Sequence, residues 1–160
     1  MKLALAILAA IIALALTGWL VTRNEGKLEA KLPARFSFAS LDDALLAATK
    51  YSDTFGGQVC SVLGTGSMAP FIPASPGKVA VPVAYAVMGL PQSFESIKQG
   101  ELLVYRPTWG TGFAVHLASQ KTTSGWIMSG LANAHSESAW RVTQTNYVGT
   151  VKAVFVCPTP

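Results

Sequence analysis

An uncharged apolar run at the start of the chain constrains its fold more than any other feature. Residues 3–21 read LALAILAAIIALALTGWLV and contain no charged residue and no proline. The run is close to the ~20 residues that a helix needs to span a bilayer. Such a helix has no polar face, unlike an ordinary helix of a globular domain, and Trp19 lies where an interfacial aromatic residue is expected. We therefore expect residues 1–22 to form a single-pass transmembrane anchor.

A cleaved signal peptide is the alternative interpretation of this segment. The apolar region of a signal peptide usually has only ~7–15 residues and ends at small residues. Ala13-Leu14-Ala15 has the composition of such a cleavage site, but the apolar run continues beyond it. The length of the run therefore favours an uncleaved anchor.

Positive charge is concentrated next to the apolar run. Five of the 12 Lys and Arg residues lie within residues 1–35, where they favour anionic headgroups, so we expect the lipid bilayer as a partner. Four of these residues follow the run, at Arg23, Lys27, Lys31 and Arg35. The positive-inside rule would keep them in the cytoplasm, in conflict with a domain on the extracytoplasmic side. The rest of the chain has no basic helix and no aromatic–basic pattern, so no nucleic-acid partner is expected.

Two cysteines, Cys60 and Cys157, bound the redox and metal chemistry. They are too few and too far apart for a zinc site of ordinary spacing, so we expect no metal and no cofactor. In an oxidising compartment they could form a disulfide that closes a long loop. Two buried thiols are the equal alternative, because spacing alone does not define pairing.

The segment after the anchor divides into a linker with a helix over residues 23–57 and a β-rich domain over residues 58–160. Residues 22–37 are polar and charged and contain Pro33, which is typical of a juxtamembrane linker. Residues 40–55 predict an amphipathic helix with Ser40 as its N-cap and leucines at near-helical spacing. Gly56-Gly57 ends this helix.

Strand signals fill the remainder of the chain. Short apolar runs separated by turns rich in Gly, Pro, Ser and Thr are typical of a mainly β domain. Pro82 indicates an edge strand or a bulge in the second predicted strand. The predicted strands are residues 58–64, 78–87, 101–107, 112–120, 124–130 and 146–157.

Ser67 carries the clearest chemical signal, in the segment GTGSMAP of residues 64–70. It directly follows a predicted strand, and Gly66 permits unusual dihedral angles and a close approach of a substrate backbone. A lone serine in such a turn is most often a turn former. A nucleophilic serine needs a base, and the sequence offers His116 in a predicted strand and His135 in a polar loop.

Five motifs follow one another along residues 59–155: TGSMAP, GELLVYRP, FAVHLAS, GLANAHSE and YVGTVKAVF. In this order they resemble the type I signal peptidase family, in particular its histidine type from the endoplasmic reticulum and archaea. The wider clan includes the self-cleaving repressors. The resemblance implies a signal-peptidase-like β-rich domain and a membrane-tethered serine endopeptidase. Its substrates would be signal or leader peptides, or one dedicated precursor, bound in extended form along a strand edge.

The resemblance also implies a role for individual residues. Ser67 falls on the nucleophile and His116 on the base, as in the histidine type. Thr65, two residues before the nucleophile, matches a hydroxyl that completes the oxyanion hole in some members, with the Ser67 amide as the other donor. Glu137 or Asn133 would orient the imidazole, and Asn133 is also expected to contact substrate.

Two departures from the family pattern support a second hypothesis. Lys78 and Leu131 stand where the family has aspartate, which leaves Glu137 as the nearby carboxylate. A catalytically inactive signal-peptidase-like subunit, acting as a binding or structural protein in a membrane-protein complex, is therefore the alternative. The presence of both Ser67 and His116 favours the enzyme. A DNA-binding repressor is disfavoured, because an apolar helix stands where a helix-turn-helix would be needed.

Overall fold

The computed structural model describes residues 29–90, 92–108, 112–133 and 137–157, the side chains of 137–140 excepted. The predicted anchor, residues 1–22, lies outside this part of the chain. Among the described residues, no helix is long and apolar enough to cross a membrane.

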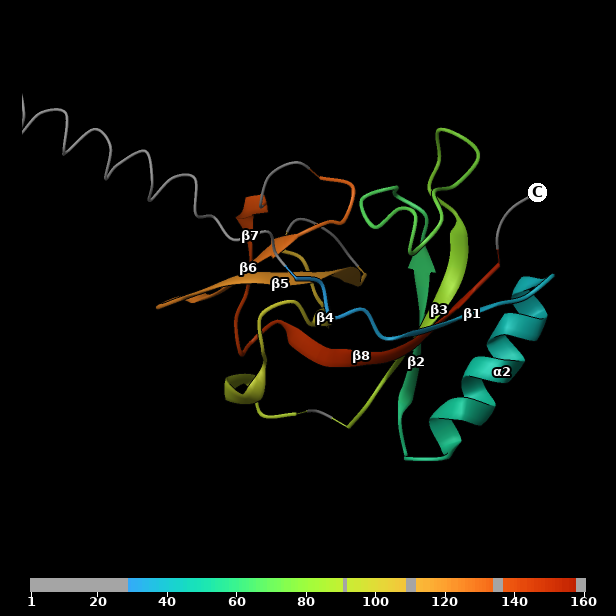
Figure 1. Cartoon of the computed structure of the whole chain (residues 1–160), viewed down its shortest axis with the longest axis horizontal. Coiled ribbons are helices and arrows are strands. Elements are labelled where there is room, and N and C mark those ends of the chain that lie inside the picture. The colour runs from blue at the N-terminus through green and yellow to red at the C-terminus, as the bar shows by residue number, and fades with distance from the viewer. Residues whose placement is uncertain (1–28, 91, 109–111, 134–136, 158–160) are drawn as a thin grey trace, which may run out of the picture.

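A single curled sheet of eight strands forms the body of the described chain (Figure 1). Its strands follow the order β2-β3-β8-β4-β5-β6-β7 with antiparallel neighbours, and β1 pairs with β8 in parallel. The predicted mainly β architecture is confirmed. The strands are β1 Ala34–Ser37, β2 Gln58–Leu63, β3 Pro82–Met88, β4 Leu102–Tyr105, β5 Ala114–Thr122, β6 Gly125–Ser129, β7 Glu137–Val142 and β8 Tyr147–Val156.

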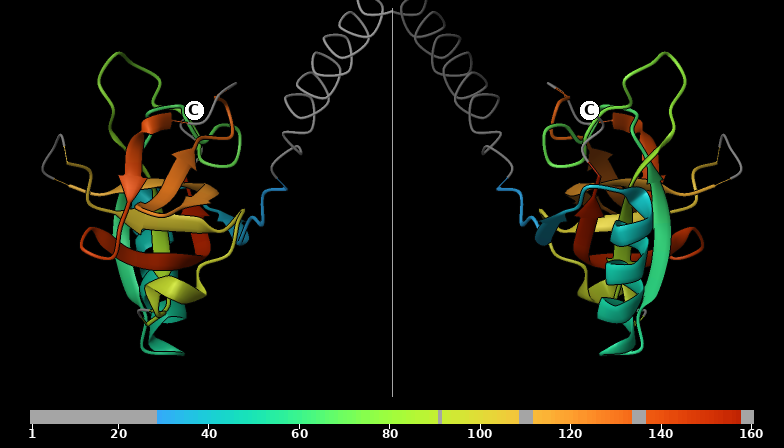
Figure 2. Two further views of the ribbon diagram at one scale, coloured as in Figure 1. Left: turned by 90° about the vertical axis from the view of Figure 1, so that its left-hand side faces the viewer. Right: turned by 90° about the vertical axis from the view of Figure 1, so that its right-hand side faces the viewer.

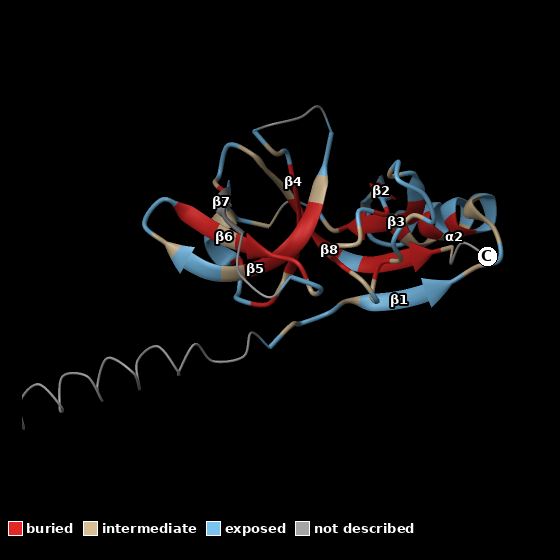
Figure 3. Ribbon diagram, turned by 90° about the horizontal axis from the view of Figure 1, so that it is seen from above, coloured by how far each residue is buried: buried red, intermediate tan, exposed pale blue. Residues whose placement is uncertain are grey.

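Strand β8 connects the two halves of the sheet. Its first residues pair with β4, as in Leu103↔Thr150, and its last residues pair with β3, as in Ala84↔Val156. The strand is therefore shared between two sets of neighbours, and the sheet curls around it. Seen from above, β8 and β4 are mostly buried while β1 is exposed along its length (Figure 3). One apolar cluster, inside the curl, combines residues of β2, β3, β4, β5 and β8. A second combines residues of β4, β5, β6 and β7, and a third lies between helix α2 and the sheet.

Helix α2, Leu41–Asp53, covers the half of the sheet formed by β2, β3 and β8 (Figure 2). The Ser40 hydroxyl accepts a hydrogen bond from the Asp43 amide at 3.1 Å, which satisfies a backbone donor at the start of the helix. Ala44 and Ala48 are fully buried against the sheet, where their small side chains permit close packing. The helix predicted over residues 40–55, with Ser40 as N-cap, is confirmed.

Three details of the strand prediction differ from the structure. The second strand begins at Pro82 rather than at residue 78, and it is an interior strand between β2 and β8. Pro82 is tolerated because it is the first residue of the strand and faces a bulge at Val62/Leu63. Strand β1 lies within the predicted linker, and β7 was not predicted. Strand β1 has only four residues and pairs with β8 at the other end of the sequence, whereas β7 pairs with the preceding strand, β6.

No disulfide joins Cys60 and Cys157. Strand β3 lies between β2, which carries Cys60, and β8, which Cys157 follows. Strands β2 and β8 are thus two inter-strand spacings of about 4.8 Å apart. This separation exceeds the ~7 Å limit between the Cα atoms of a disulfide. Both cysteines are thiols, and Cys157 Sγ donates to the Ala39 carbonyl at 3.6 Å. The disulfide alternative is therefore wrong for this structure.

Candidate active site

The loop that follows β2 carries Ser67, and apolar residues of this loop are buried in the core. Met68 is 4% exposed and Ile72 is 3% exposed, and both belong to the core cluster inside the curled sheet. Gly66 has a φ of 87°, a left-handed conformation that favours glycine. Between these residues, the half-buried Ser67 is presented at the end of the strand.

A second loop, residues 130–133 after β6, holds the backbone of Ser67 from the other side. The Ser67 carbonyl accepts a hydrogen bond from the Ala132 amide at 3.0 Å. A Cβ atom at Gly130 would overlap that carbonyl oxygen, so only glycine permits this close approach. The position of Ser67 is therefore set by two loops that are distant in the sequence.

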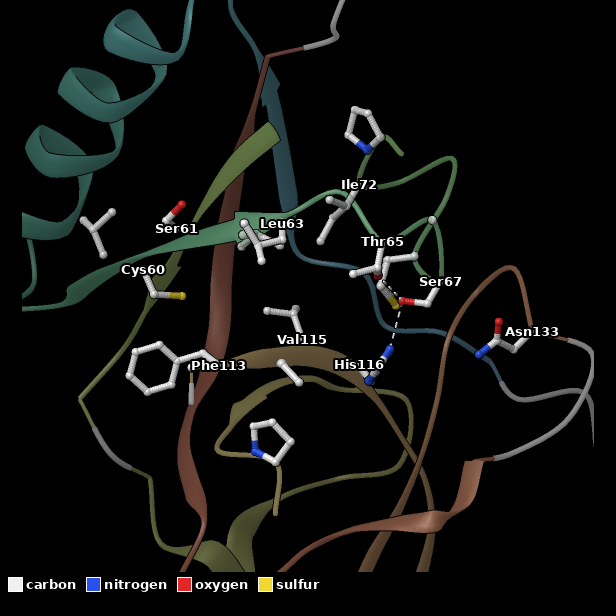
Figure 4. A pocket seen from close by; sticks show the side chains of 18 residues that line it. Cys60, Ser61, Leu63, Thr65, Ser67, Ile72, Phe113, Val115, His116 and Asn133 are labelled. Carbon is white, nitrogen blue, oxygen red and sulfur yellow. Dashed lines mark hydrogen bonds between the residues drawn. The ribbon is translucent and has the colours of Figure 1, made fainter. Parts of the chain in front are cut away.

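Strand β5 brings His116 to Ser67. His116 is paired with Leu103 of β4 and is 5% exposed. Its Nε2 atom lies 2.9 Å from Ser67 Oγ, although the two residues are 49 positions apart (Figure 4). The structure therefore brings together the serine and the histidine that the motifs single out.

Burial governs the protonation of His116. Loss of hydration lowers the pKa of its imidazole from 6.5 to about 4, because the charged form is disfavoured in the interior. The imidazole is consequently neutral at pH 7. A neutral imidazole can accept the proton of a serine hydroxyl, which an imidazolium cannot.

Thr65 lies beside the serine on the exposed side of the loop. Its Oγ1 atom is 3.1 Å from Ser67 Oγ. The hydroxyl is thus within reach of the region where charge would develop on a substrate carbonyl attacked by Ser67, the place expected of an oxyanion donor.

Tyr105 is a site residue that the sequence alone did not reveal. Its hydroxyl lies 2.9 Å from His116 Nδ1, and the residue is 1% exposed. Tyr105 pairs with Ala114 on β5, two positions from the Leu103↔His116 pair, so its side chain is on the same face as the imidazole. A tyrosine in the otherwise aliphatic strand LLVY was the available signal, but the register between β4 and β5 was needed to interpret it.

Of the two residues expected to orient the imidazole, the structure describes the side chain of one, Asn133. Asn133 lines the same cavity as Ser67, and its side chain lies across from the serine loop (Figure 4). Glu137 begins β7 opposite Met128, but its side chain lies outside the described residues, as does His135.

Within the described part of the chain, no group of three His, Cys, Asp or Glu residues could hold a metal ion.

A cavity of about 940 Å³ opens in front of Ser67 and His116, between β2 and the beginning of β5. No Lys, Arg, Asp or Glu occurs among the described residues that line it. The apolar part of its wall includes Val59, Val62, Leu63, Ile72, Phe113 and Val115. The cavity thus suits an uncharged, largely apolar ligand rather than a charged one.

Cys60 also contributes to this wall but is a poor nucleophile there. Burial raises the pKa of its thiol to about 11, so the thiol is protonated at neutral pH. Among the described side chains of the cavity, the serine next to a neutral imidazole is therefore the better candidate for nucleophilic chemistry.

Comparison of the chain with protein-family models, with curated proteins and with solved structures gave no match.

Proposed function

We propose that this chain is a membrane-bound serine endopeptidase with a signal-peptidase-like fold, which cleaves signal or leader peptides or one dedicated precursor. The observation that carries the proposal is the 2.9 Å separation of Ser67 Oγ and His116 Nε2 at the wall of a large cavity. Nucleophile and base are within hydrogen-bond reach of each other, the arrangement that activates a serine for attack.

The reaction follows from this geometry in two stages. As Ser67 Oγ attacks the peptide carbonyl, its proton passes to His116 Nε2, and the carbonyl oxygen becomes an oxyanion. In this proposal, the Ser67 backbone N–H and the Thr65 hydroxyl donate hydrogen bonds to that oxyanion. His116 then protonates the departing amine, which leaves an acyl-enzyme on Ser67. Water, deprotonated by the same imidazole, attacks the acyl carbonyl, the ester bond to Ser67 Oγ breaks, and His116 returns the proton to the serine oxygen. This chemistry requires neither a metal nor a cofactor.

The substrate is an extended peptide that lies between two strand edges. Strand β2 is the last strand at one end of the described sheet. In β5, residues 114–116 pair with β4, whereas pairing with β6 begins only at Leu117, so no described strand covers their other edge. The cavity lies between these two edges. A peptide there gains main-chain hydrogen bonds, and the uncharged lining suits the apolar segments of exported precursors.

The cellular setting rests on the first part of the sequence. We propose that residues 1–22 anchor the chain in the bilayer as a single-pass helix, with the β domain on the extracytoplasmic side. The domain would meet precursors as they emerge from the membrane, alone or within a membrane-protein complex.

The test compares the purified full chain in detergent with Ser67→Ala and His116→Ala, using exported precursor proteins as substrates. Each variant is expected to lose at least about 10³-fold in kcat/KM, because nucleophile and base act as a unit. Ser96→Ala is the matched control, since the hydrogen bond described for this exposed hydroxyl is a local one, to the Ser93 carbonyl. Cleavage should be retained in that variant.

Two outcomes would contradict the proposal. If the wild type is as inert as both variants across the precursors tested, the chain is better described as an inactive subunit with a binding or structural role. If the Ser67→Ala protein cleaves as fast as the wild type, the activity comes from another nucleophile.

A further inference from the structure

The hydroxyl of Tyr105 occupies a fixed place next to the candidate base. Its ring is buried in the cluster formed by Leu103, Ala118, Trp126, Met128 and Val142. The Tyr105 and His116 ring centroids are 6.2 Å apart. Because packing determines where the phenol ring lies, the core holds the hydroxyl 2.9 Å from Nδ1.

The tautomer of His116 decides whether its Nε2 atom can accept the proton of Ser67. A neutral imidazole carries one proton, on either Nδ1 or Nε2. Only the tautomer protonated on Nδ1 leaves a lone pair on Nε2 to receive the Ser67 proton. In hydrolases with a Ser-His-Asp triad, a carboxylate selects that tautomer by accepting the Nδ1 proton. Among the described residues, a phenol hydroxyl lies at hydrogen-bond distance from Nδ1.

We propose that Tyr105 is a positioning residue whose hydroxyl oxygen accepts the Nδ1–H of His116 and keeps the Nε2 lone pair directed at Ser67. The inference rests on the proposed function and adds a neutral orienting partner to it. Thr65 then donates to Ser67, Ser67 to His116, and His116 to Tyr105, so that one directed chain of hydrogen bonds crosses the site.

Tyr105→Phe is the test variant, because it removes the hydroxyl and leaves the ring that packs in the core. We expect kcat for precursor cleavage to fall about ten- to hundredfold, the effect of leaving a buried donor without its partner. KM should stay within about twofold, since Tyr105 does not line the cavity. Tyr147→Phe is the matched control: Tyr147 pairs with Tyr105 across β4 and β8, but its hydroxyl contacts Thr150 at 2.8 Å.

A second readout is independent of catalysis. Nitrogen NMR of ring-labelled histidine reports the tautomer directly, and comparison with His116→Ala separates the signals of the two histidines in the sequence. The wild type and Tyr147→Phe should show His116 protonated on Nδ1. In Tyr105→Phe the population should move toward protonation on Nε2.

The outcomes separate this inference from the proposed function. Protonation on Nε2 in the wild type would overturn it, because Tyr105 would then be the donor. An unchanged tautomer and an unchanged kcat in Tyr105→Phe would overturn it as well. If the wild type cleaves no precursor but the tautomer of His116 still shifts in Tyr105→Phe, the proposed peptidase activity is refuted. Tyr105 is then still the positioning residue of His116.

Discussion

At the scale of single residues, His116 shows how burial shapes the site. The imidazole is 5% exposed, and the hydrogen bonds described for it go to Ser67 and Tyr105, which are both uncharged. Protonating it in the folded state would place a positive charge in a poorly solvated position. The fold therefore keeps the base in its neutral form by desolvation.

This burial predicts a pH dependence of stability. The pKa of His116 is about 4 in the folded chain and close to 6.5 when hydrated, so the unfolded chain binds more protons between these values. Its contribution to stability is present above pH 6.5 and is lost as the pH falls toward 4, by up to roughly 3 kcal/mol. The measurement is the free energy of unfolding by denaturant at several pH values. His116→Gln should show a smaller loss over the same window, and parallel curves for the two proteins would contradict the prediction.

Single residues also show which parts of the site short sequence motifs can predict and which they cannot. Ser67 and His116 could be singled out because each lies in a short motif that resembles a known pattern. Tyr105 could not, because its role depends on the pairing of β4 with β5. A strand signal indicates where a strand lies in the sequence, but it does not state which residues of two strands face each other.

At the scale of elements, the site is a meeting of loops and strands from distant parts of the chain. Ser67 belongs to the loop after β2, its carbonyl is held by the loop after β6, and its base lies on β5. Strand β1 adds a contact of its own, since Arg35 Nε donates to the Phe71 carbonyl of the serine loop at 2.8 Å. The residues that follow the predicted anchor are thus connected to the loop that carries the nucleophile.

The close approach of the two loops predicts the effect of Gly130→Ala. An added Cβ would overlap the Ser67 carbonyl oxygen, so one loop must shift. We expect the free energy of unfolding to fall by about 1–3 kcal/mol, and cleavage to fall as Ser67 moves away from His116. Thermal or denaturant unfolding, together with the precursor assay, checks both effects.

Gly77→Ala is the control for this prediction. A Cβ at Gly77 meets nothing within 4 Å, so that variant should behave like the wild type. If Gly130→Ala were as stable and as active as Gly77→Ala, the approach of the two loops would not constrain the site.

At the scale of the whole molecule, the proposed function depends on which side of the membrane the β domain occupies. The apolar run of residues 3–21 supports an anchor, whereas the basic residues that follow it favour a cytoplasmic domain under the positive-inside rule. Peptide substrates that emerge from the membrane require the opposite side.

A reporter that is active only outside the cytoplasm, fused after Pro160, tests the topology. We expect activity from the fusion with the full chain and none from the same fusion lacking residues 1–22. Fractionation of the full-length fusion should place it with the membranes. A fusion that is inactive at equal expression would refute the extracytoplasmic location. Cys60 and Cys157 should remain thiols on either side, because strand β3 separates β2, which carries Cys60, from β8, which Cys157 follows.

The sequence by itself determined the features that depend on local patterns. These are the uncharged run of residues 3–21, the mainly β composition, the capped helix that begins after Ser40, and the strand-end turn around Ser67. Only the tertiary structure decided the sheet order, the place of β8 between the two halves, the separation of the cysteines, and the contacts of His116 with Ser67 and Tyr105. The physical reason is that most of these features arise from pairing between strands far apart in the chain, and the contact of His116 with Tyr105 arises from the register of β4 with β5. Such pairing is selected by the packing of the whole core, which no local pattern encodes.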